Sequence, residues 1–387
     1  MQNSYAELFS AFGGVGFLDR IESAGFNRLP APYLNGSMWS MQYFHKTNAI
    51  GGCNAYGLPF ECCVANGNQG WPRFTSHLYA LPKQNDDGSQ DLAALLYAPS
   101  TLDTVLPAAP DSTDSTDSTD GREPRSAIRM NARRRAIGSA GSAGGNRVRI
   151  KLDTEYPFRE ELKFAVEAEA AFKLRLRIPQ WAVQPTLALG SAAPAVVAPG
   201  ADGFHIVELP AGASELTLRL PMEVRVEEEQ AGGVSVHAGA LLFALDLAPK
   251  EHNTGPGGCY YPPDGCEIAA LVPSVNWRQA LLLDKSAGAS GGLSLERVEA
   301  GGAAGSAPPF NRASVALRIR AKAAVLANSS WPTVNCTSME SGCHDCVGPI
   351  PSSSAVEEAR AAEEGEVTLL PFGATDIRMG VMPATWR

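Results

Sequence analysis

The sequence lacks three features that would point to particular classes of function. No run of apolar residues approaches the length needed to cross a membrane. Residues 1–9 contain neither a basic region nor an apolar core, so no signal peptide is visible, and both a cytoplasmic and a secreted location fit. Positive charge is not in excess, because 32 Lys and Arg stand against 41 Asp and Glu, for a net charge of -9. We therefore expect no nucleic-acid partner and no membrane partner.

What is present is the composition of a globular protein. The chain has 387 residues, which is long enough for two or three domains. Its residues are 44% hydrophobic, an ordinary fraction for a chain with a sizeable core. The eight cysteines fall into three groups, and one group contains the adjacent pair Cys62 and Cys63. A disulfide between neighbours is strained, whereas paired thiolates suit metal binding or nucleophilic attack. Buried cysteines that only fill space are the alternative.

The other cysteines allow several interpretations. Cys259 and Cys266 bracket a turn and would close a small disulfide loop in an oxidising compartment. The C-x-x-C of Cys343–Cys346 has Cys336 as a third thiol nearby. A disulfide or free thiols are favoured there, and a structural zinc site with His344 as the fourth ligand is the alternative.

Helical spacing is confined to the first part of the chain. The pattern of apolar residues predicts helix within residues 1–31, which end in two prolines. A second helix is expected over residues 67–81, and its apolar stripe comprises Trp71, Phe74, Leu78 and Tyr79. Residues 33–60 show little periodicity and are interpreted as a long loop with room for one short strand, and residues 92–98 are interpreted as a buried strand.

Residues 107–146 interrupt this organisation. They begin with a Ser-Thr-Asp repeat, continue through the run Arg133–Arg135 and end in Gly, Ser and Ala. Such a composition buries too little apolar area to offset its ordering entropy, so we expect a disordered insertion. The arginine run would suit a nucleic-acid or targeting patch, but a solvated insertion is favoured by the acidic total charge.

From Arg147 onward the hydrophobic period is two. Alternation of this kind, with short spacing between strands, predicts antiparallel sheets in a sandwich. A second all-β block is expected to start near Val224 and to run to a closing strand near Val367. Residues 286–308 and 351–365, rich in Gly, Ala and Ser, are interpreted as flexible surface loops.

Several segments together resemble one protein family, glycoside hydrolase family 127, the β-L-arabinofuranosidase-like group. The resemblance rests on residues 17–31, 41–44, 47–48, 60–74, 174–182 and 367–375. Two positions depart from the family pattern: Gln180 stands where glycine is usual, and Ala238–Ala240 replaces an Arg-Gly-Pro turn.

The resemblance implies a mixed, mainly β fold, in which the last helices of an (α/α) barrel precede two antiparallel β-sandwich domains. On that basis we expect the end of the barrel in residues 1–88, a middle sandwich in 89–223 and a C-terminal sandwich in 224–387. It also implies hydrolysis of a carbohydrate with a terminal β-L-arabinofuranosyl or related sugar.

The chemistry that the resemblance implies is a retaining mechanism with a zinc-activated cysteine. Matched position by position, Cys62 is the catalytic nucleophile and a zinc ligand, and Cys63 is a second zinc ligand. No residue of 1–60 matches the family's glutamate acid/base or its upstream zinc ligands. A non-catalytic carbohydrate-binding or interaction protein on the same fold is therefore the alternative.

Other residues near the pair have competing interpretations. Cys53, His45 and His77 would serve as substitute metal ligands or sugar contacts, but a single histidine at a loop edge is more often structural. Glu61 would act beside the pair or be an ordinary loop acid. Trp71 would stack on a sugar, but its helical stripe favours core packing.

Overall fold

The computed structural model divides into two compact units. It describes residues 2–33, 40–41, 46–56, 67–107, 145–230, 232–253, 268–298, 309–335, 345–360 and 363–387. The first unit comprises Met1–Ala24 and Trp71–Met222, and the second comprises Gly25–Gly70 and Glu223–Arg387. Each unit is assembled from segments far apart in the sequence, and the expected insertion at 107–146 falls almost entirely outside the described residues.

Two helices open the first unit. α1 (Gln2–Phe12) and α2 (Val15–Ser23) are separated by Gly13 and Gly14, whose φ angles of 70° and 85° end the first helix. A π-helical turn, η1 (Ala24–Arg28), follows α2 directly in the chain. Phe9 of α1 and the α2 residues Leu18 and Ile21 are buried, so each helix has an apolar face turned to the core. The helical prediction for residues 1–31 is confirmed.

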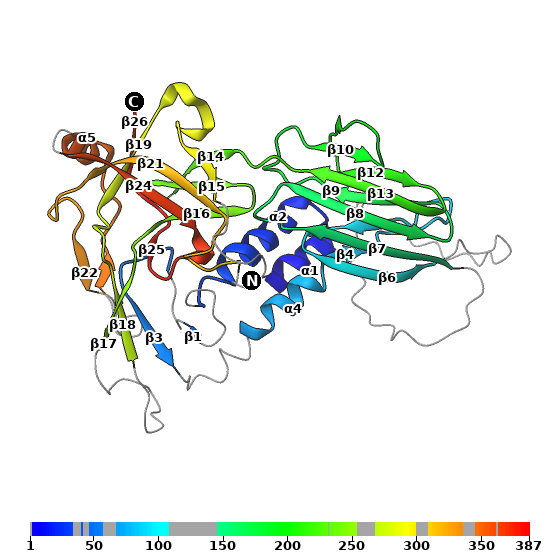
Figure 1. Cartoon of the computed structure of the whole chain (residues 1–387), viewed down its shortest axis with the longest axis horizontal. Coiled ribbons are helices and arrows are strands. Elements are labelled where there is room, and N and C mark those ends of the chain that lie inside the picture. The colour runs from blue at the N-terminus through cyan, green and yellow to red at the C-terminus, as the bar shows by residue number, and fades with distance from the viewer. Residues whose placement is uncertain are drawn as a thin grey trace. The chain divides into compact units, whose positions relative to one another are not determined.

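The described strands of the first unit form two sheets (Figure 1). One has the order β11-β10-β13-β8-β7-β6 and is antiparallel throughout. Its strands are β6 (Ser100–Leu106), β7 (Asn146–Thr154), β8 (Glu161–Ala168), β10 (Thr186–Leu189), β11 (Ala195–Val196) and β13 (Gly212–Arg219). The other has the order β12-β9-β5-β4. Its strands are β4 (Tyr79–Ala80), β5 (Leu92–Ala94), β9 (Phe172–Arg177) and β12 (Phe204–Leu209).

Burial along these strands follows the predicted alternation. In β8 every second residue is buried, and in β7 the buried positions Val148, Ile150 and Leu152 alternate with exposed charged ones. Tyr97, which follows β5, packs edge-on against Phe164 of β8 with ring centroids 6.3 Å apart, so the buried faces of the two sheets meet. β5 and β9 pair in parallel, which departs from the expectation of antiparallel sheets.

The second predicted helix is shorter than expected. α4 spans Gly70–Thr75 only, and Tyr79 already belongs to β4, where it pairs with Ala94. The hydroxyls of Thr75 and Ser76 donate hydrogen bonds back to carbonyl oxygens of the preceding turn, at 3.0 and 2.8 Å. Such local bonds compete with continued helix and end it. Pairing with β5 then places Tyr79 in a strand, although the spacing of apolar residues had predicted that it belongs to the helix.

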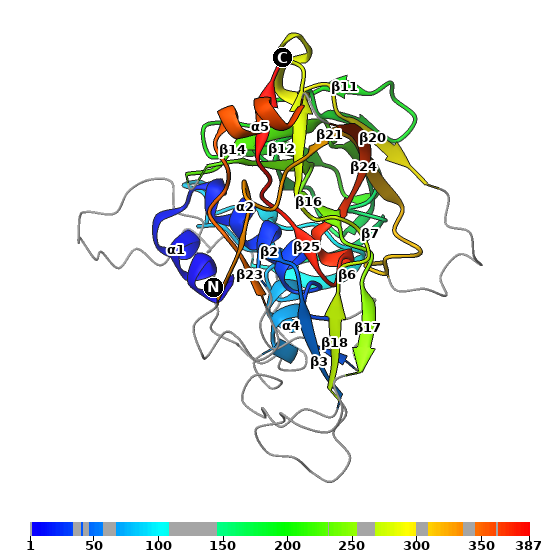
Figure 2. The same ribbon diagram turned by 90° about the vertical axis from the view of Figure 1, so that its left-hand side faces the viewer.

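The second unit is built on one large described sheet (Figure 2). Its main order is β14-β15-β16-β24-β21-β19-β26, with β2, β20 and β25 paired at its sides. The strands are β2 (Asn48–Ala49), β14 (Val224–Glu228), β15 (Val234–Ala238), β16 (Leu241–Asp246), β19 (Gln279–Leu283), β20 (Ser294–Arg297), β21 (Leu317–Val325), β24 (Glu364–Pro371), β25 (Arg378–Met379) and β26 (Ala384–Trp386). β19 and β26 pair in parallel, and the other pairs are antiparallel. A β-rich block starting at Val224 is what the sequence predicts.

Smaller sheets complete this unit in the described residues. One contains β1 (Ser40–Met41), β3 (Gly52–Tyr56), β18 (Ile268–Val272) and β17 (Lys250–Asn253), and another contains β22 (Thr333–Asn335) and β23 (Asp345–Val347). Short turns of 3-10 helix occur at η3 (Lys285–Ser290) and η4 (Phe372–Ala374).

Two segments of the second unit are more ordered than predicted. Residues 286–308 were expected to be a loop, but they contain most of η3 and the strand β20, which pairs with β21. Residues 351–365 were also expected to be a loop, but they contain α5 (Ser353–Arg360). Val356 of α5 is fully buried, and Glu357 accepts a hydrogen bond from Thr385. Tertiary contacts therefore stabilise a helix that the polar sequence of this segment does not predict.

No helix in the described segments combines the length and the hydropathy that a membrane-spanning helix requires. The overall architecture is mainly β with few helices.

Candidate functional site

The residues predicted to carry the chemistry lie outside the part of the chain that the structure describes. Cys62, Cys63 and Glu61 fall within residues 57–66, and His45 falls within residues 42–45. Cys53 lies on β3, where its backbone pairs with Ala270 of β18. The nucleophile and zinc-ligand assignments therefore stay predictions.

The described residues also contain no alternative metal centre. No group of three or more His, Cys, Asp or Glu side chains among them could hold a metal ion. Cys336 and Cys343 lie outside these residues, and Cys346 is placed only by its backbone, which pairs with Val334 in β22 and β23.

His77 and Trp71, both singled out in the sequence, are described and have structural roles. The His77 ring donates from Nδ1 to the carbonyl oxygen of Arg73 at 2.5 Å, at the end of α4. Trp71 packs edge-on against the buried Phe74, with ring centroids 5.8 Å apart. The helix end and the core account for both side chains, so neither supports a ligand role.

The second unit contains a serine, a histidine and glutamates close together, but not in a catalytic arrangement. Ser235 Oγ donates to Glu229 Oε1 at 2.6 Å and lies 3.0 Å from His237 Nε2. Glu227 approaches that same ring nitrogen at 3.7 Å. A hydrolytic triad needs the carboxylate on the other ring nitrogen. Burial lowers the pKa of His237 to about 4, although Glu227 opposes the shift, so the ring is neutral at physiological pH.

The most organised polar site in the described residues lies on one face of β9 in the first unit. Lys173, Arg175 and Arg177 alternate along this strand and so point to the same face. Each cation meets carboxylates from other elements, and burial increases along the strand from Lys173 to Arg177. Lys173 Nζ lies 3.7 Å from Glu208 of β12, and both side chains are exposed. We call this row the β9 cation row.

The Arg177 end of the row is fully buried. Its guanidinium pairs with Asp19 and Glu22 of α2 and donates from Nε to the carbonyl oxygen of Leu95 at 2.5 Å. The Tyr97 hydroxyl in turn donates to the Arg177 carbonyl oxygen at 2.5 Å. One arginine thus joins α2, β9 and the segment after β5.

Glu22 is a buried carboxylate with a perturbed pKa. Burial raises the pKa of Glu22, and the nearby Arg177 opposes that shift. Trp181 donates from Nε1 to Glu22 Oε2 at 3.4 Å. A raised carboxyl pKa is also found in catalytic acids. Here the side chain is only 1% exposed and lines neither of the grooves described below, so its role is to hold α2 on the sheet.

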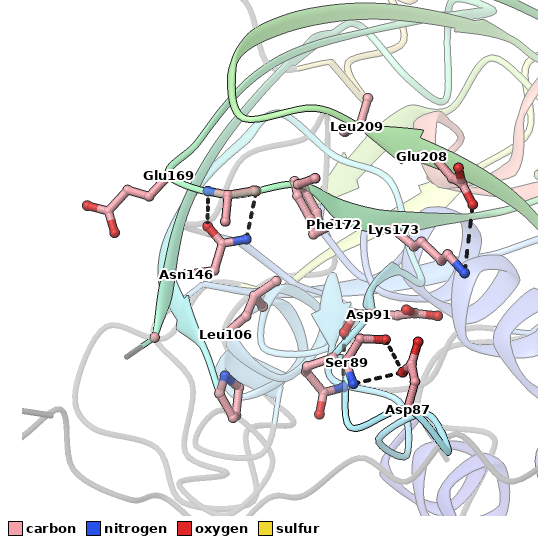
Figure 3. A pocket seen from close by; sticks show the side chains of 15 residues that line it. Asp87, Ser89, Asp91, Leu106, Asn146, Glu169, Phe172, Lys173, Glu208 and Leu209 are labelled. Atoms are coloured by element: carbon pink, nitrogen blue, oxygen red, sulfur yellow. Dashed lines mark hydrogen bonds and ion pairs between the residues drawn. The ribbon is translucent and has the colours of Figure 1, made fainter. Parts of the chain in front are cut away.

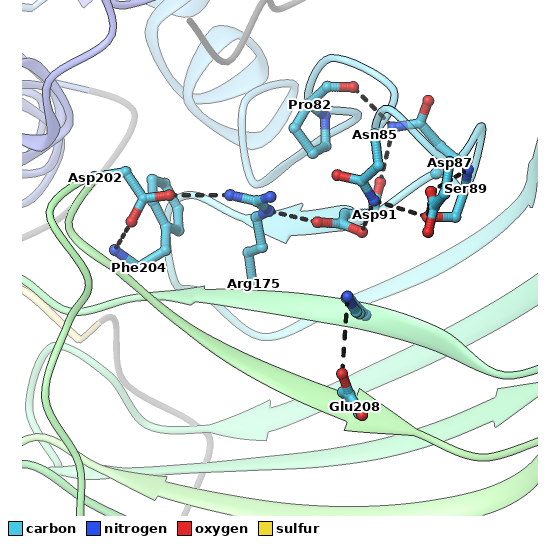
Figure 4. A network of polar contacts seen from close by, with 11 residues as sticks. Pro82, Asn85, Asp87, Ser89, Asp91, Arg175, Asp202, Phe204 and Glu208 are labelled. Atoms are coloured by element: carbon cyan, nitrogen blue, oxygen red, sulfur yellow. Dashed lines mark hydrogen bonds and ion pairs between the residues drawn. The ribbon is translucent and has the colours of Figure 1, made fainter. Parts of the chain in front are cut away.

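The middle of the row is organised around Arg175 (Figure 4). Its Nε donates to Asp91 at 2.7 Å, and its Nη1 donates to Asp202 at 2.9 Å. Asn85 donates to the other oxygen of Asp91 at 2.7 Å. These contacts fix residues 82–91, the segment before β5, over the face of β9.

Removing the Asp91 carboxylate is expected to destabilise this segment. Asp91 is 2% exposed and accepts bonds from Arg175 and Asn85, so Asp91→Ala leaves two donors without that acceptor. We expect the free energy of unfolding to fall by about 1–3 kcal/mol. Urea denaturation measures it, with Asp87→Ala as the matched control, because Asp87 is exposed and bonds only locally to Ser89. Equal effects of the two substitutions would contradict this role for Asp91.

Two open grooves flank residues 82–91. The first, with a volume of about 750 Å³, lies at the Lys173 end and is shown in Figure 3. We call it the Lys173 groove. Its charged lining residues are Asp87, Asp91, Glu169, Lys173 and Glu208, so it is acidic. Its aromatic residue, Phe172, is only 7% exposed.

The second groove, of about 1120 Å³, lies beside the Arg175 cluster. It is lined by the end of α1, the turn of residues 13–16, residues 82–86 and residues 201–204, together with Arg175 and Gln180. We call it the Phe12 groove, because Phe12 at the end of α1 lines it and is 71% exposed.

Sequence reasoning missed the β9 cation row and both grooves. Three cations at alternate positions of a strand are visible in the sequence and indicate a charged face. Their partners Asp19, Glu22, Asp91 and Asp202 are distant in the chain. Nothing in a single sequence links them to β9.

Comparisons with known proteins identify the middle of the chain. Residues 137–222 match the family model described as the middle domain of the glycoside hydrolase family 127 β-L-arabinofuranosidase. No protein with curated function is significantly similar in sequence to the chain. The matched segment contains β7 to β13, that is, five of the six described strands of one sheet of the first unit and two of the four described strands of the other.

Solved structures share the fold over almost the whole chain. A GH127 β-L-arabinofuranosidase from Geobacillus stearothermophilus T6 is 14% identical with a TM-score of 0.55, over 99% of this chain and 48% of that one. A glycoside hydrolase is 14% identical with a TM-score of 0.54, over 98% and 50%. A GH127 β-arabinofuranosidase is 12% identical with a TM-score of 0.55, over 98% and 48%.

The chain thus spans about half the length of the solved structures that it matches. The middle-domain match and the shared fold confirm the resemblance to family 127 that the sequence predicts. At this level of identity the solved structures show the fold and leave the chemistry to be tested.

Proposed function

We propose that this chain is part of a glycoside hydrolase that removes terminal β-L-arabinofuranosyl or related sugars with retention of configuration. The observation that carries the proposal is the family 127 middle domain at residues 137–222. The shared fold with structures described as a β-L-arabinofuranosidase and a β-arabinofuranosidase supports it. In this proposal the helices of residues 1–88 are the end of an (α/α) barrel, and residues 89–223 and 224–387 form two β-sandwich domains.

The proposed reaction uses Cys62 as the nucleophile. Its thiolate attacks the anomeric carbon, the bond from that carbon to the leaving oxygen breaks, and a carboxylic acid gives that oxygen a proton. Water, deprotonated by the same carboxylate, then displaces the sulfur and restores the thiolate. Two displacements at one carbon give retention. Zinc bound at Cys62 and Cys63 would supply the positive charge that keeps the thiol ionised at neutral pH.

The alternative is a carbohydrate-binding protein without catalytic activity on the same fold. It is kept in view because no residue of 1–60 matches the family's glutamate acid/base or its upstream zinc ligands. In that case the fold would be retained without the metal.

Zinc content separates the two proposals. In the catalytic proposal, elemental analysis of the purified chain should give about one zinc ion per chain, and the Cys62→Ala/Cys63→Ala variant should contain none. The matched control is Cys343→Ala/Cys346→Ala, which should keep its zinc. Zinc that persists without Cys62 and Cys63 but is lost in the control would instead indicate a structural site at the C-x-x-C. A metal-free intact chain would count against the catalytic proposal.

A further inference from the structure

The Phe12 groove has the features of a binding site for a neutral sugar, and nothing in the proposed reaction uses it. We propose that this groove binds a neutral oligosaccharide, with the Phe12 ring as a stacking platform. Only the choice of arabinose-containing probes rests on the proposed function.

The chain ends α1 so that Phe12 faces the groove. Gly13 and Gly14 have positive φ and turn the chain directly after Phe12. Phe9, one helical turn earlier, is 1% exposed, as is Phe204 on the sheet side, whereas Phe12 is 71% exposed. A single exposed apolar side chain on a convex surface needs no explanation, but this one lines a concave site.

The charges of the groove balance, which favours a neutral ligand. Among its described lining residues the charged ones are Lys83, Asp86, Arg175 and Asp202, two cations and two carboxylates. Arg175 is already paired with Asp202 at 2.9 Å and with the buried Asp91 at 2.7 Å. An anionic or cationic ligand would therefore meet no excess of the opposite charge. The Lys173 groove, with four carboxylates and one lysine, has no such balance and no exposed aromatic ring.

Polar groups around the ring match the hydroxyls of a sugar. Gln84, Asn85 and Gln180 bring amides to the groove, and Asp86 brings a carboxylate. One face of a sugar ring presents C–H groups that pack on an aromatic face, and the rim presents hydroxyls that need donors and acceptors. The groove supplies both kinds of surface at one place.

The shape of the groove favours a chain of sugars over a single one. Gly13, Gly14 and Gly16 line it without side chains, so a ligand can approach the backbone closely. Its volume of about 1120 Å³ is at the upper end of what small-molecule sites offer.

Gln180 is one of the two positions at which this chain departs from the family pattern, and glycine is usual there. Its exposed side chain lines the groove, and a Cβ built on Gly16 would lie 3.7 Å from Gln180 Oε1. The departure therefore adds an amide to this groove. We expect Gln180 to contribute to the choice of sugar, with Phe12 as the main contact.

Calorimetric titration of the whole chain with short arabino-oligosaccharides tests the proposal, with oligogalacturonides as charged sugars for comparison. We expect neutral oligosaccharides to bind, and Phe12→Ala to weaken their binding roughly tenfold, the change expected when the central contact is lost. Gln180→Gly should weaken binding by a smaller factor. Val196→Ala is the matched control, because Val196 is 68% exposed in the same unit and lines neither groove.

The Cys62→Ala/Cys63→Ala variant distinguishes this groove from the catalytic proposal. Its neutral oligosaccharide binding should equal that of the intact chain, whether or not the intact chain hydrolyses arabinosides. Four outcomes would overturn the groove proposal. In two of them, the intact chain binds no neutral oligosaccharide or prefers charged sugars. In the other two, Phe12→Ala leaves binding unchanged, or Cys62→Ala/Cys63→Ala abolishes it. Hydrolysis by the intact chain would stand in each of these cases.

Discussion

Replacing Arg177 with methionine is expected to lower the free energy of unfolding by about 3–5 kcal/mol, as breaking a buried ion pair does when one charge stays behind. Arg177 is fully buried, and its partners Glu22 and Asp19 are 1% and 18% exposed. Methionine fills much of the same space but leaves the Glu22 carboxylate without a cation. Chemical denaturation followed by circular dichroism measures the change.

An exposed pair provides the control for this substitution. Arg149 and Asp103 are 54% and 43% exposed, so Arg149→Met should change stability by no more than about 1 kcal/mol. Adding Glu22→Gln to Arg177→Met removes the stranded charge and should recover part of the loss. An Arg177→Met protein as stable as the Arg149→Met protein would show that the buried pair does not hold α2 to the sheet.

The effect of Arg177→Met should also depend on pH. Burial raises the pKa of Glu22, and Arg177 lowers it, so the substitution raises it further. A carboxyl whose folded pKa lies above its unfolded value binds a proton more readily in the folded state, so its stability contribution is lost as pH rises. The Arg177→Met protein should therefore lose stability relative to the intact chain as pH rises past the folded-state pKa of Glu22 in the intact chain, which already lies above the ordinary glutamate value of 4.5. A difference that shrinks with rising pH would contradict this.

Replacing Cys62 with alanine is expected to lower the hydrolysis of an aryl β-L-arabinofuranoside by roughly three orders of magnitude or more, if the chain carries the proposed activity. The reason is that no other group forms the bond to the anomeric carbon. A serine at this position should not restore activity, because its hydroxyl is far less ionised than a thiol at neutral pH.

The control for Cys62→Ala is Cys259→Ala, which removes a thiol outside the segments that resemble the family. It should keep full activity. Proton NMR of the first-formed sugar checks the mechanism, since retention requires the product anomer to match the substrate. Inversion, or a Cys62→Ala protein with more than about a tenth of the activity, would refute the cysteine nucleophile.

Most of the local structure follows from the sequence because hydrophobic period is a local property. The alternation from Arg147 onward predicts β7, β8 and β13, whose buried residues occupy every second position. The start of the second β-rich block near Val224 also agrees with β14. Where the local preference for helix or strand was weak, contacts with other elements determined the secondary structure. Tyr79 joined a strand, and residues 353–360 became a helix.

Function was indicated by motif and not by geometry. Residues 174–182, which resemble the family in sequence, lie within the middle domain that the family model matches. The role of Cys62 and Cys63 stays a prediction, because they lie outside the described residues. The expectation of a carbohydrate partner came from the resemblance alone. Composition and charge argued only against nucleic-acid and membrane partners.

The sequence by itself determined the β-rich class, the alternating burial along β7, β8 and β13, and the resemblance of the middle of the chain to family 127. Tertiary structure alone decided that Arg177, Glu22 and Asp19 form one buried cluster, and that Phe12 and Gln180 line one groove. The physical reason is distance along the chain. A pattern records which face of its own strand or helix is buried, whereas pairing between residues 155 or more positions apart depends on how the elements pack.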